Sequence, residues 1–417
     1  MFRKRLLLGL MLLVSCVLVA GGTALGASEA GGPLEQANKL FEEKKYGEAE
    51  EAYLEITGKG TAEALTAQRQ LALLYIATGE LPKAGAAYQQ LLNRFGGQEG
   101  ISEAVWGIAR GYGGAGEKAK ALEIYRYNVE HYPNDKYAMW SQVEIAYCHI
   151  RDGEEPEADE AVDKLLNAFS GQENLPKEIH QIGRAFGEAK RNDKALELYR
   201  YNVEYFPEDK YAMWSQVESV HYHIEDGNET AAEEAVDELI EVFSEQPTFP
   251  KELYQVAMKY RNPKTKKRVL ELHEYNVEHY PDYDDVHAMW SQVEIAKRHI
   301  RDGDEVAAQQ AYEKLLTTFS GKPTLAKEVC IVGDVYCQQG DYERGTQIYQ
   351  YVMDRWAGSE HLVWARAGMA KVDAALGNEV SATARIDGLL ADFKDHPDLA
   401  QVIGSIAEVH WHNAFIR

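Results

Sequence analysis

Apolar side chains recur along this chain with the period of an α-helix. Within residues 210–225 they lie three or four positions apart, at Met213, Val217, Val220 and Ile224. Asp226 and Gly227 interrupt this pattern, and it resumes from 229 to 243. The period-two alternation of a half-buried strand never runs long enough to specify one. The pattern therefore predicts an all-α chain built from pairs of amphipathic helices.

One segment is repeated three times at long intervals. Ala-Met-Trp-Ser-Gln-Val-Glu occupies 138–144, 212–218 and 288–294, and a degenerate copy lies at 362–365. The tryptophans are 74, 76 and 74 residues apart, at Trp140, Trp214, Trp290 and Trp364. The two extra residues fall in the turn at 282–286, where stacked helical pairs tolerate insertions. Each long repeat contains four amphipathic segments, so it corresponds to two helical hairpins in tandem.

The hairpins share a second pattern, a small residue followed by aromatic residues, Ala and Pro at fixed intervals. It is complete at Gly183, Phe186, Ala195, Tyr199 and Pro207, and again at Ala109, Tyr112, Ala121, Tyr125 and Pro133. This pattern resembles the tetratricopeptide repeat. The resemblance covers nearly all of residues 33–417 and implies a right-handed α-α superhelical solenoid of about ten hairpins. Small residues would let paired helices approach closely, while aromatic rings fill the space between neighbouring hairpins.

The hairpins that begin with the tryptophan segment depart from this pattern. They have His149, His223 or His299 where an aromatic residue is expected. In this respect they resemble the looser hairpins of bacterial envelope assembly factors.

The resemblance also implies where partners bind. In the tetratricopeptide superfamily the first helix of each hairpin lines a groove that holds peptides or partner helices. Carried over to this chain, the groove positions are Trp140, Tyr147, Arg151, Trp214, His221, Glu225, Trp290, Lys297 and Arg301. The repeated tryptophan fits either of two roles, packing between hairpins or anchoring a partner. The other two positions vary between copies, so we expect them to determine specificity.

The N-terminus has the features of a secretory signal peptide. Basic residues at 3–5 precede an apolar run from Leu6 to Ala20 and small residues up to Ala27. We therefore expect a mature chain without a membrane span, exported to the periplasm or secreted. A lipoprotein-like box ending at Cys16 offers an alternative, in which that cysteine anchors the protein to a membrane.

Charge excludes nucleic acid as a partner. The formal net charge is −23, and a phosphate backbone needs clustered Lys and Arg. The mature chain has one basic cluster, at 260–268, which replaces a usual hairpin turn. We expect it to form either a solvated turn or a docking point for acidic groups of a partner or of this chain.

We find no sequence pattern that indicates an enzyme, a metal site or a cofactor. The pairs His221/His223 and His410/His412 would point to opposite sides of a helix, so neither can share a metal. Cys148, Cys330 and Cys337 are too scattered for a disulfide framework. Catalytic serine, phosphate-loop and zinc-protease motifs do not occur.

These observations divide the chain into a signal peptide (1–27), a linker (28–32), N-terminal hairpins (33–135), tandem long repeats (136–358) and a C-terminal degenerate repeat with a terminal helix (359–417). We expect an exported scaffold that binds protein or peptide partners, serving cell-envelope assembly or organisation. The alternatives are a lipid-anchored outer-membrane assembly component and a self-associating structural array. The apolar residues Trp411, Phe415 and Ile416 of the terminal helix fit packing on the preceding hairpin, and they also fit homo-oligomerisation or contact with a further domain.

Overall fold

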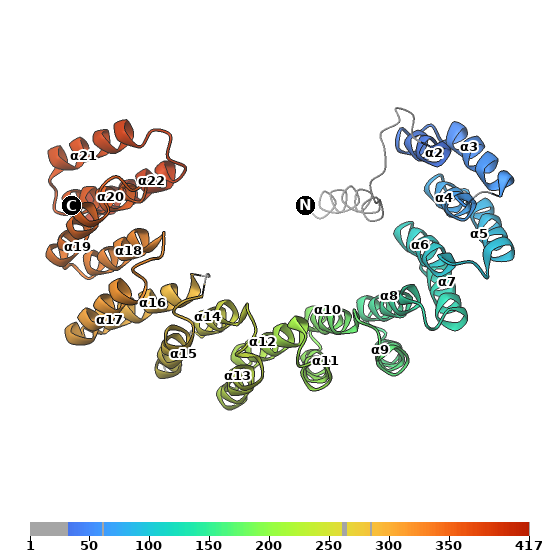
Figure 1. Cartoon of the computed structure of the whole chain (residues 1–417), viewed down its shortest axis with the longest axis horizontal. Helices are drawn as coiled ribbons and strands as arrows, with labels where there is room; N and C mark the ends of the chain where they lie inside the picture. The colour runs from blue at the N-terminus through green and yellow to red at the C-terminus, as the bar shows by residue number, and fades with distance from the viewer. Residues whose placement is uncertain (1–31, 61, 261–264, 284–285, 417) are drawn as a thin grey trace. The chain divides into compact units, whose positions relative to one another are not determined.

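The computed structural model describes residues 32–60, 62–260, 265–283 and 286–416, with side chains as far as 408. In these residues it contains twenty-one helices and no strand, which confirms the all-α prediction (Figure 1). The predicted signal peptide, Cys16 and most of the linker lie outside the described residues, as do the side chains of Trp411, Phe415 and Ile416. The chain divides into two compact units, Met1–Gln172 and Glu173–Arg417.

The first unit consists of four helical hairpins. In order, the helices are α2 (Pro33–Glu42), α3 (Tyr46–Lys59), α4 (Ala64–Ala77), α5 (Leu81–Phe95), α6 (Ile101–Gly114), α7 (Lys118–His131), α8 (Lys136–Asp152) and α9 (Glu155–Phe169). Each even-numbered helix packs against the odd-numbered helix that follows it.

The second unit consists of six hairpins and a closing helix. In order, the helices are α10 (Leu175–Glu188), α11 (Asn192–Tyr205), α12 (Lys210–Glu225), α13 (Glu229–Phe243), α14 (Phe249–Lys259), α15 (Lys266–His279), α16 (His287–Asp302), α17 (Glu305–Thr318), α18 (Leu325–Gln338), α19 (Tyr342–Arg355), α20 (Leu362–Ala375), α21 (Glu379–Asp392) and α22 (Leu399–Ile416). The ten hairpins of the described residues agree with the number expected from the sequence.

Local signals set the helix boundaries. The Asp209 side chain accepts a hydrogen bond from the Tyr211 backbone N–H at 2.7 Å and so caps the start of α12. Asp135 caps α8 in the same way. Gly227 has a φ of 71°, a left-handed conformation that glycine adopts without strain, and it separates α12 from α13. Gly227 is one of the two residues at which the hydrophobic pattern breaks.

The small positions allow close packing of helices, as the sequence predicted. A Cβ atom on Gly183 would lie 2.5 Å from the Tyr199 ring, and one on Gly333 would lie 2.8 Å from the Tyr349 ring. Tyr199 and Tyr349 are fully buried. The aromatic residue of each hairpin therefore occupies the volume that a larger side chain would need.

Buried polar side chains explain why Ser and Gln recur beside the tryptophan. The glutamine amides of the three copies donate to carbonyls of the partner helix at 2.7 to 2.8 Å: Gln142 to Ala161, Gln216 to Ala235 and Gln292 to Ala311. The serine hydroxyls accept from a buried asparagine on the preceding odd-numbered helix: Ser141 from Asn128, Ser215 from Asn202 and Ser291 from Asn276. Gln thus ties each hairpin together, and Ser ties it to its predecessor.

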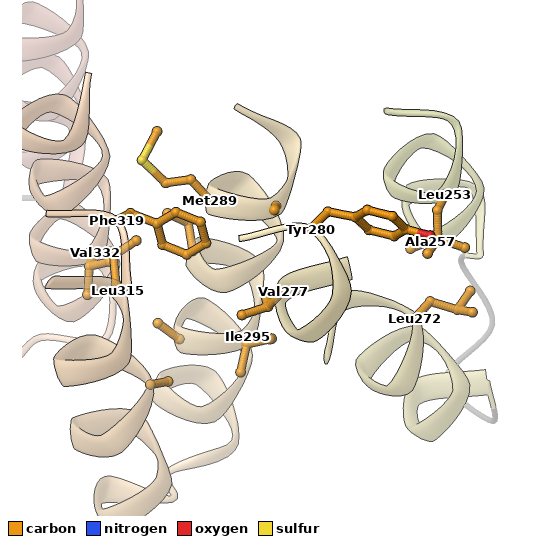
Figure 2. Close-up of a cluster of buried hydrophobic side chains, with 14 of the residues drawn as sticks. Leu253, Ala257, Leu272, Val277, Tyr280, Met289, Ile295, Leu315, Phe319 and Val332 are labelled. Atoms are coloured by element: carbon orange, nitrogen blue, oxygen red, sulfur yellow. The ribbon is translucent and has the colours of Figure 1, made fainter. Parts of the chain in front are cut away.

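Apolar side chains fill the space between the layers of helices. In the second unit one continuous buried cluster extends from Val203 to Val372. Figure 2 shows part of it, with Tyr280 next to Leu253 and Ala257 of α14. Tyr280 also donates a hydrogen bond from its hydroxyl to the Ser244 carbonyl at 2.8 Å, at the end of α13. The core therefore passes from hairpin to hairpin, and each hairpin is buried by its neighbours.

Candidate protein-binding surface

Even-numbered helices lie side by side within each unit. In the second unit α10, α12, α14, α16, α18 and α20 contact one another in succession, and the odd-numbered helices cover one side of this layer (Figure 1). The even-numbered helices of the first unit, α2 to α8, also contact one another in succession, and in each unit we call the uncovered side of this layer the even face of that unit. Half-buried and exposed residues of α12 follow it at Tyr211, Trp214, Glu218, His221 and Glu225. All three predicted positions of this helix therefore lie on one stripe.

Each repeated tryptophan belongs to a cluster of three rings on this face. In the first unit the Trp140 ring lies 4.9 Å from the Tyr137 ring and 5.6 Å from the Trp106 ring of α6, centroid to centroid. In the second unit Trp214 lies 5.0 Å from Tyr211 and 6.4 Å from His180. Trp290 likewise lies 4.8 Å from His287 and 5.8 Å from Tyr254.

These ring clusters give the tryptophan a packing role and leave part of it accessible. Trp140, Trp214 and Trp290 are all half-buried, and each bridges its own helix to the even-numbered helix before it. Aromatic pairs at such distances contribute about 0.5–1.5 kcal/mol beyond their buried area. The two roles considered for the tryptophan are therefore compatible.

A buried carboxylate supports the tryptophan in the second unit. Trp290 Nε1 donates a hydrogen bond to Glu328 Oε1 at 3.1 Å, and Glu252 is the corresponding carboxylate near Trp214. Both glutamates are buried, and burial raises the pKa of each carboxyl above its usual value. The hydrogen bond holds the indole ring in a fixed orientation.

The remaining predicted positions differ in their partners. Glu225 forms an ion pair with Lys259 at 2.8 Å, and Lys297 forms one with Glu294. His221 lies 3.9 Å from Glu218, and burial lowers its pKa to about 4, so its ring is neutral at pH 7. Tyr147 is half-buried on α8.

The two predicted arginines are the most available charges of the set. The Arg151 side chain is 73% exposed, and its nearest carboxylate oxygen is on Asp152 at 4.0 Å. Arg301 is exposed, and among the described residues it has no ion pair. It lines a pocket of about 180 Å³ between α14, α15 and α16, together with Met258 and Leu270. Arg151 and Arg301 occupy equivalent positions of two long repeats.

The described part of the basic cluster pairs with acidic groups of the same chain. Lys266 lies 3.5 Å from Asp302, Lys267 lies 3.2 Å from Glu271, and Arg268 contacts Asp237. These contacts fit the expectation of docking within the chain. Residues 261–264 of the cluster lie outside the described residues.

Potential metal ligands do not cluster in the described chain, and its cysteines are free thiols. No group of three or more His, Cys, Asp or Glu residues there could hold a metal ion. Cys148 and Cys330 are buried thiols, and Cys337 is half-buried on the same helix as Cys330.

Sequence reasoning missed three residues of the ring clusters. Trp106, His180 and Tyr254 precede the repeated tryptophans by 34, 34 and 36 residues, the length of about one hairpin. Their residue types differ, so a search for identical residues passes over them. A search for any aromatic or imidazole ring one hairpin before each tryptophan would have found all three.

Residues 66–97 match a family model described as tetratricopeptide repeat. The matched segment contains most of α4 and all of α5, one hairpin of the first unit. The ten hairpins of the described residues repeat this pairing of two helices. The hairpin at 66–97 is a tetratricopeptide repeat, and the chain as a whole has the fold of stacked hairpins of this kind.

Solved tetratricopeptide-repeat structures are similar to this chain at low identity. The C-terminal part of a TPR repeat-containing protein from Cytophaga hutchinsonii is 16% identical, covering 71% of this chain and 98% of that one, with a TM-score of 0.34. A tetratricopeptide repeat protein from Parabacteroides merdae is 13% identical, covering 64% and 98%, with a TM-score of 0.30. Yeast Tom70 is 12% identical, covering 92% and 96%, with a TM-score of 0.29.

The search of curated proteins gave no match. Among the described helices, none combines the length and apolarity needed to cross a membrane. The function is therefore inferred from the side chains of the even face.

Proposed function

We propose that this tetratricopeptide-repeat chain is a non-enzymatic, exported scaffold that holds a protein or peptide partner along its even face, in cell-envelope assembly or organisation. One observation carries the proposal: the ring clusters and the variable positions beside them form a stripe on the layer that the odd-numbered helices leave uncovered. Half-buried aromatic rings flanked by arginine are the composition typical of protein-binding hot spots.

The surface suits binding better than catalysis. Each unit offers a partner several neighbouring groups, half-buried rings together with an exposed arginine, Arg151 in the first unit and Arg301 in the second. Each contact would be weak, and the affinity would come from their number. Export to the envelope is supported by the signal-like sequence of residues 1–27.

Affinity capture with matched variants tests this function. The bait is the tagged chain from 28 onward, incubated with an envelope extract of the source bacterium, and the retained proteins are identified by mass spectrometry. Arg151→Glu with Arg301→Glu reverses the charge of the two predicted arginines, one on the even face of each unit. Lys164→Glu with Lys314→Glu makes the same change on exposed sites of α9 and α17, odd-numbered helices.

We expect a defined partner to be retained by the wild type and by the odd-helix variant, and to be lost from the even-face variant. All three proteins should keep the same helical melting curve. A partner that the even-face variant retains at wild-type affinity would refute the assignment of this surface.

A further inference from the structure

Lysine and tryptophan alternate along the even face of the second unit. Near the start of each even-numbered helix from α10 to α20, one position is occupied in turn by Lys177, Trp214, Lys251, Trp290, Lys327 and Trp364. Consecutive members are 37, 37, 39, 37 and 37 residues apart, and the interval of 39 contains the two extra residues of the turn at 282–286. They therefore occupy the same place in six successive hairpins. We call these six side chains the Lys-Trp row.

Side-chain contacts join the last three members of the row. Trp290 Nε1 donates to Glu328, the residue after Lys327, and Lys327 Nζ lies 4.6 Å from the centroid of the Trp364 ring. Adjacent residues of a helix point about 100° apart, so the glutamate is buried beneath the tryptophan while the lysine stays accessible. The preceding long repeat has the same order of residues: Trp214, Lys251 and buried Glu252.

The lysines of the row are accessible cations. Their side chains are 49%, 47% and 34% exposed, in chain order. Each ammonium nitrogen lies 3.8–3.9 Å from one carboxylate oxygen, on Glu178, Glu252 and Asp398 in turn, which is beyond hydrogen-bond distance. A fourth cation, Lys210 Nζ, lies 5.7 Å from the centroid of the Trp214 ring. Ion pairs between accessible groups are weak, so these lysines can exchange their carboxylates for those of a partner.

The row is a basic and aromatic strip on an acidic chain. Its three lysines are each the third residue of their helix, where the positive end of the helix macrodipole also favours anions. Among the carboxylates that follow the tryptophans on α12 and α16, Glu225 pairs with Lys259, and Glu294 pairs with Lys297. Burial raises the pKa of a third, Glu218. Accessible lysines between half-buried rings are complementary to a segment that carries both carboxylates and apolar side chains.

An acidic polysaccharide offers the same charge but fits the rings less well. A sugar stacks flat on an aromatic ring and therefore needs a free ring face. Lys210 lies over the Trp214 ring, Lys327 lies over the Trp364 ring, and two neighbouring rings pack against Trp290. The separate side chains of a peptide can instead contact the accessible edges of these half-buried rings.

We infer that the Lys-Trp row of the second unit binds an acidic segment of a partner protein, with carboxylates against its lysines and aromatic or aliphatic side chains against its tryptophans. This inference rests on the proposed function, because it names the class of partner for the even face of this unit.

Calorimetric titration at low ionic strength with synthetic peptides tests the inference. The probes are (Glu-Asp-Phe-Ser)4, the equally charged (Glu-Asp-Ala-Ser)4, the basic (Lys-Lys-Phe-Ser)4, and an oligogalacturonate as an acidic polysaccharide. The protein is the chain from 28 onward, as wild type and as three variants. Lys251→Gln with Lys327→Gln removes two charges of the row, and Lys251→Arg with Lys327→Arg keeps them. Lys267→Gln with Lys314→Gln removes two exposed charges from α15 and α17, odd-numbered helices, and serves as the matched control.

We expect (Glu-Asp-Phe-Ser)4 to bind the wild type about tenfold more tightly than either of the other two peptides does. The Gln variant of the row should bind it at least about fivefold more weakly than the wild type, whereas the Arg variant and the control should bind it as the wild type does. All four proteins should keep the same helical melting curve.

Four results would overturn the inference. Absence of binding, or equal affinity for the basic peptide, would show that the row does not select carboxylates. Equal affinity for (Glu-Asp-Ala-Ser)4 would show a charge effect without a role for the rings. Unchanged binding to the Gln variant would place the peptide elsewhere, and tighter binding of oligogalacturonate would favour an acidic polysaccharide.

Failure here is distinguishable from failure of the proposed function. If capture of a native partner depends on Arg151 and Arg301 while the acidic peptide does not bind, the even face binds another kind of segment. If neither depends on the even face, both proposals are wrong.

Discussion

Removing the buried asparagine that joins neighbouring hairpins should destabilise the second unit. Asn202 on α11 is fully buried, and its amide donates to the Pro176 carbonyl at 2.8 Å, the Tyr211 carbonyl at 3.4 Å and Ser215 Oγ at 3.0 Å. The amide has two N–H groups, so Asn202→Ala deletes two full hydrogen bonds and the weaker, shared contact at 3.4 Å. It also removes Asn202 Oδ1, a buried acceptor that has no partner among the described residues.

The magnitude follows from these contacts. The two full hydrogen bonds and the shared contact together cost about 2–3 kcal/mol, and removal of the unpartnered acceptor returns about 1 kcal/mol, so the free energy of unfolding should fall by about 1–2 kcal/mol. Asn276 provides an internal comparison, because its amide has only the two full bonds, to the Pro250 carbonyl and to Ser291 Oγ. Its Oδ1 is likewise without a partner in the described chain, so Asn276→Ala should cost about 1 kcal/mol.

Urea unfolding followed by far-ultraviolet circular dichroism measures both values, with Arg200→Ala, an exposed change on α11, as the control. We expect the order Asn202→Ala, then Asn276→Ala, then Arg200→Ala, which should lie within about 0.5 kcal/mol of the wild type. The reasoning is refuted if Asn202→Ala is no more destabilising than Arg200→Ala.

Three further predictions concern packing, pH and the tryptophan support. Gly183→Ala should destabilise by about 2 kcal/mol, because its Cβ would lie 2.5 Å from the buried Tyr199 ring, whereas Gly404→Ala, with open space inside α22, should stabilise by about 0.5–1 kcal/mol in the same urea assay. Burial lowers the pKa of His273 to about 4, so the unfolded chain binds its proton first, and stability should fall between about pH 6.5 and pH 4. The difference in unfolding free energy between pH 7.5 and pH 4.5 should therefore shrink in His273→Gln, and an unchanged difference would contradict the assignment. Trp290→Phe should cost about 1–3 kcal/mol because Glu328 loses its donor, and the double-mutant cycle with Glu328→Gln should show coupling of at least about 0.5 kcal/mol.

The sequence was sufficient to predict the helices of this fold, because their boundaries depend on local signals. The helix predicted for 210–225 is α12, and the one predicted for 229–243 is α13. Both are bounded by the Asp and Gly residues that break the hydrophobic pattern. The close-approach role of Gly183 was also predictable, since the tetratricopeptide pattern marks this position.

The polar contacts between hairpins were not predictable in the same way. Asn202 lies in a repeated Tyr-Asn-Val-Glu sequence that reads as an ordinary exposed helix segment, yet it is fully buried against α10 and α12. Its environment depends on how consecutive hairpins meet, and no periodicity within one helix contains that information. The ring partners His180 and Tyr254 were missed for the same reason.

The predicted binding positions share one face of their helix, but their side chains differ in charge and in ion pairing. Trp214, His221 and Glu225 share one stripe of α12, as the spacing required. Equivalent positions of two repeats differ in ion pairing, however. Glu225 pairs with Lys259 of the next even-numbered helix, whereas Arg301, the equivalent residue on α16, is exposed. Pairing across helices depends on residues about 34 positions away, so the sequence of a single repeat does not reveal which charges are available.

Site-specific photocrosslinking in living cells tests the central claim most directly, that the even face holds the partner. A photoreactive phenylalanine replaces Gln255 or Arg301 on the even face, and Glu241 or Lys314 on odd-numbered helices, all exposed positions of the second unit. The account predicts one protein adduct of the same mass from both even-face positions and none of that mass from the other two. An adduct of that mass from Glu241 or Lys314, with none from Gln255 and Arg301, would contradict it.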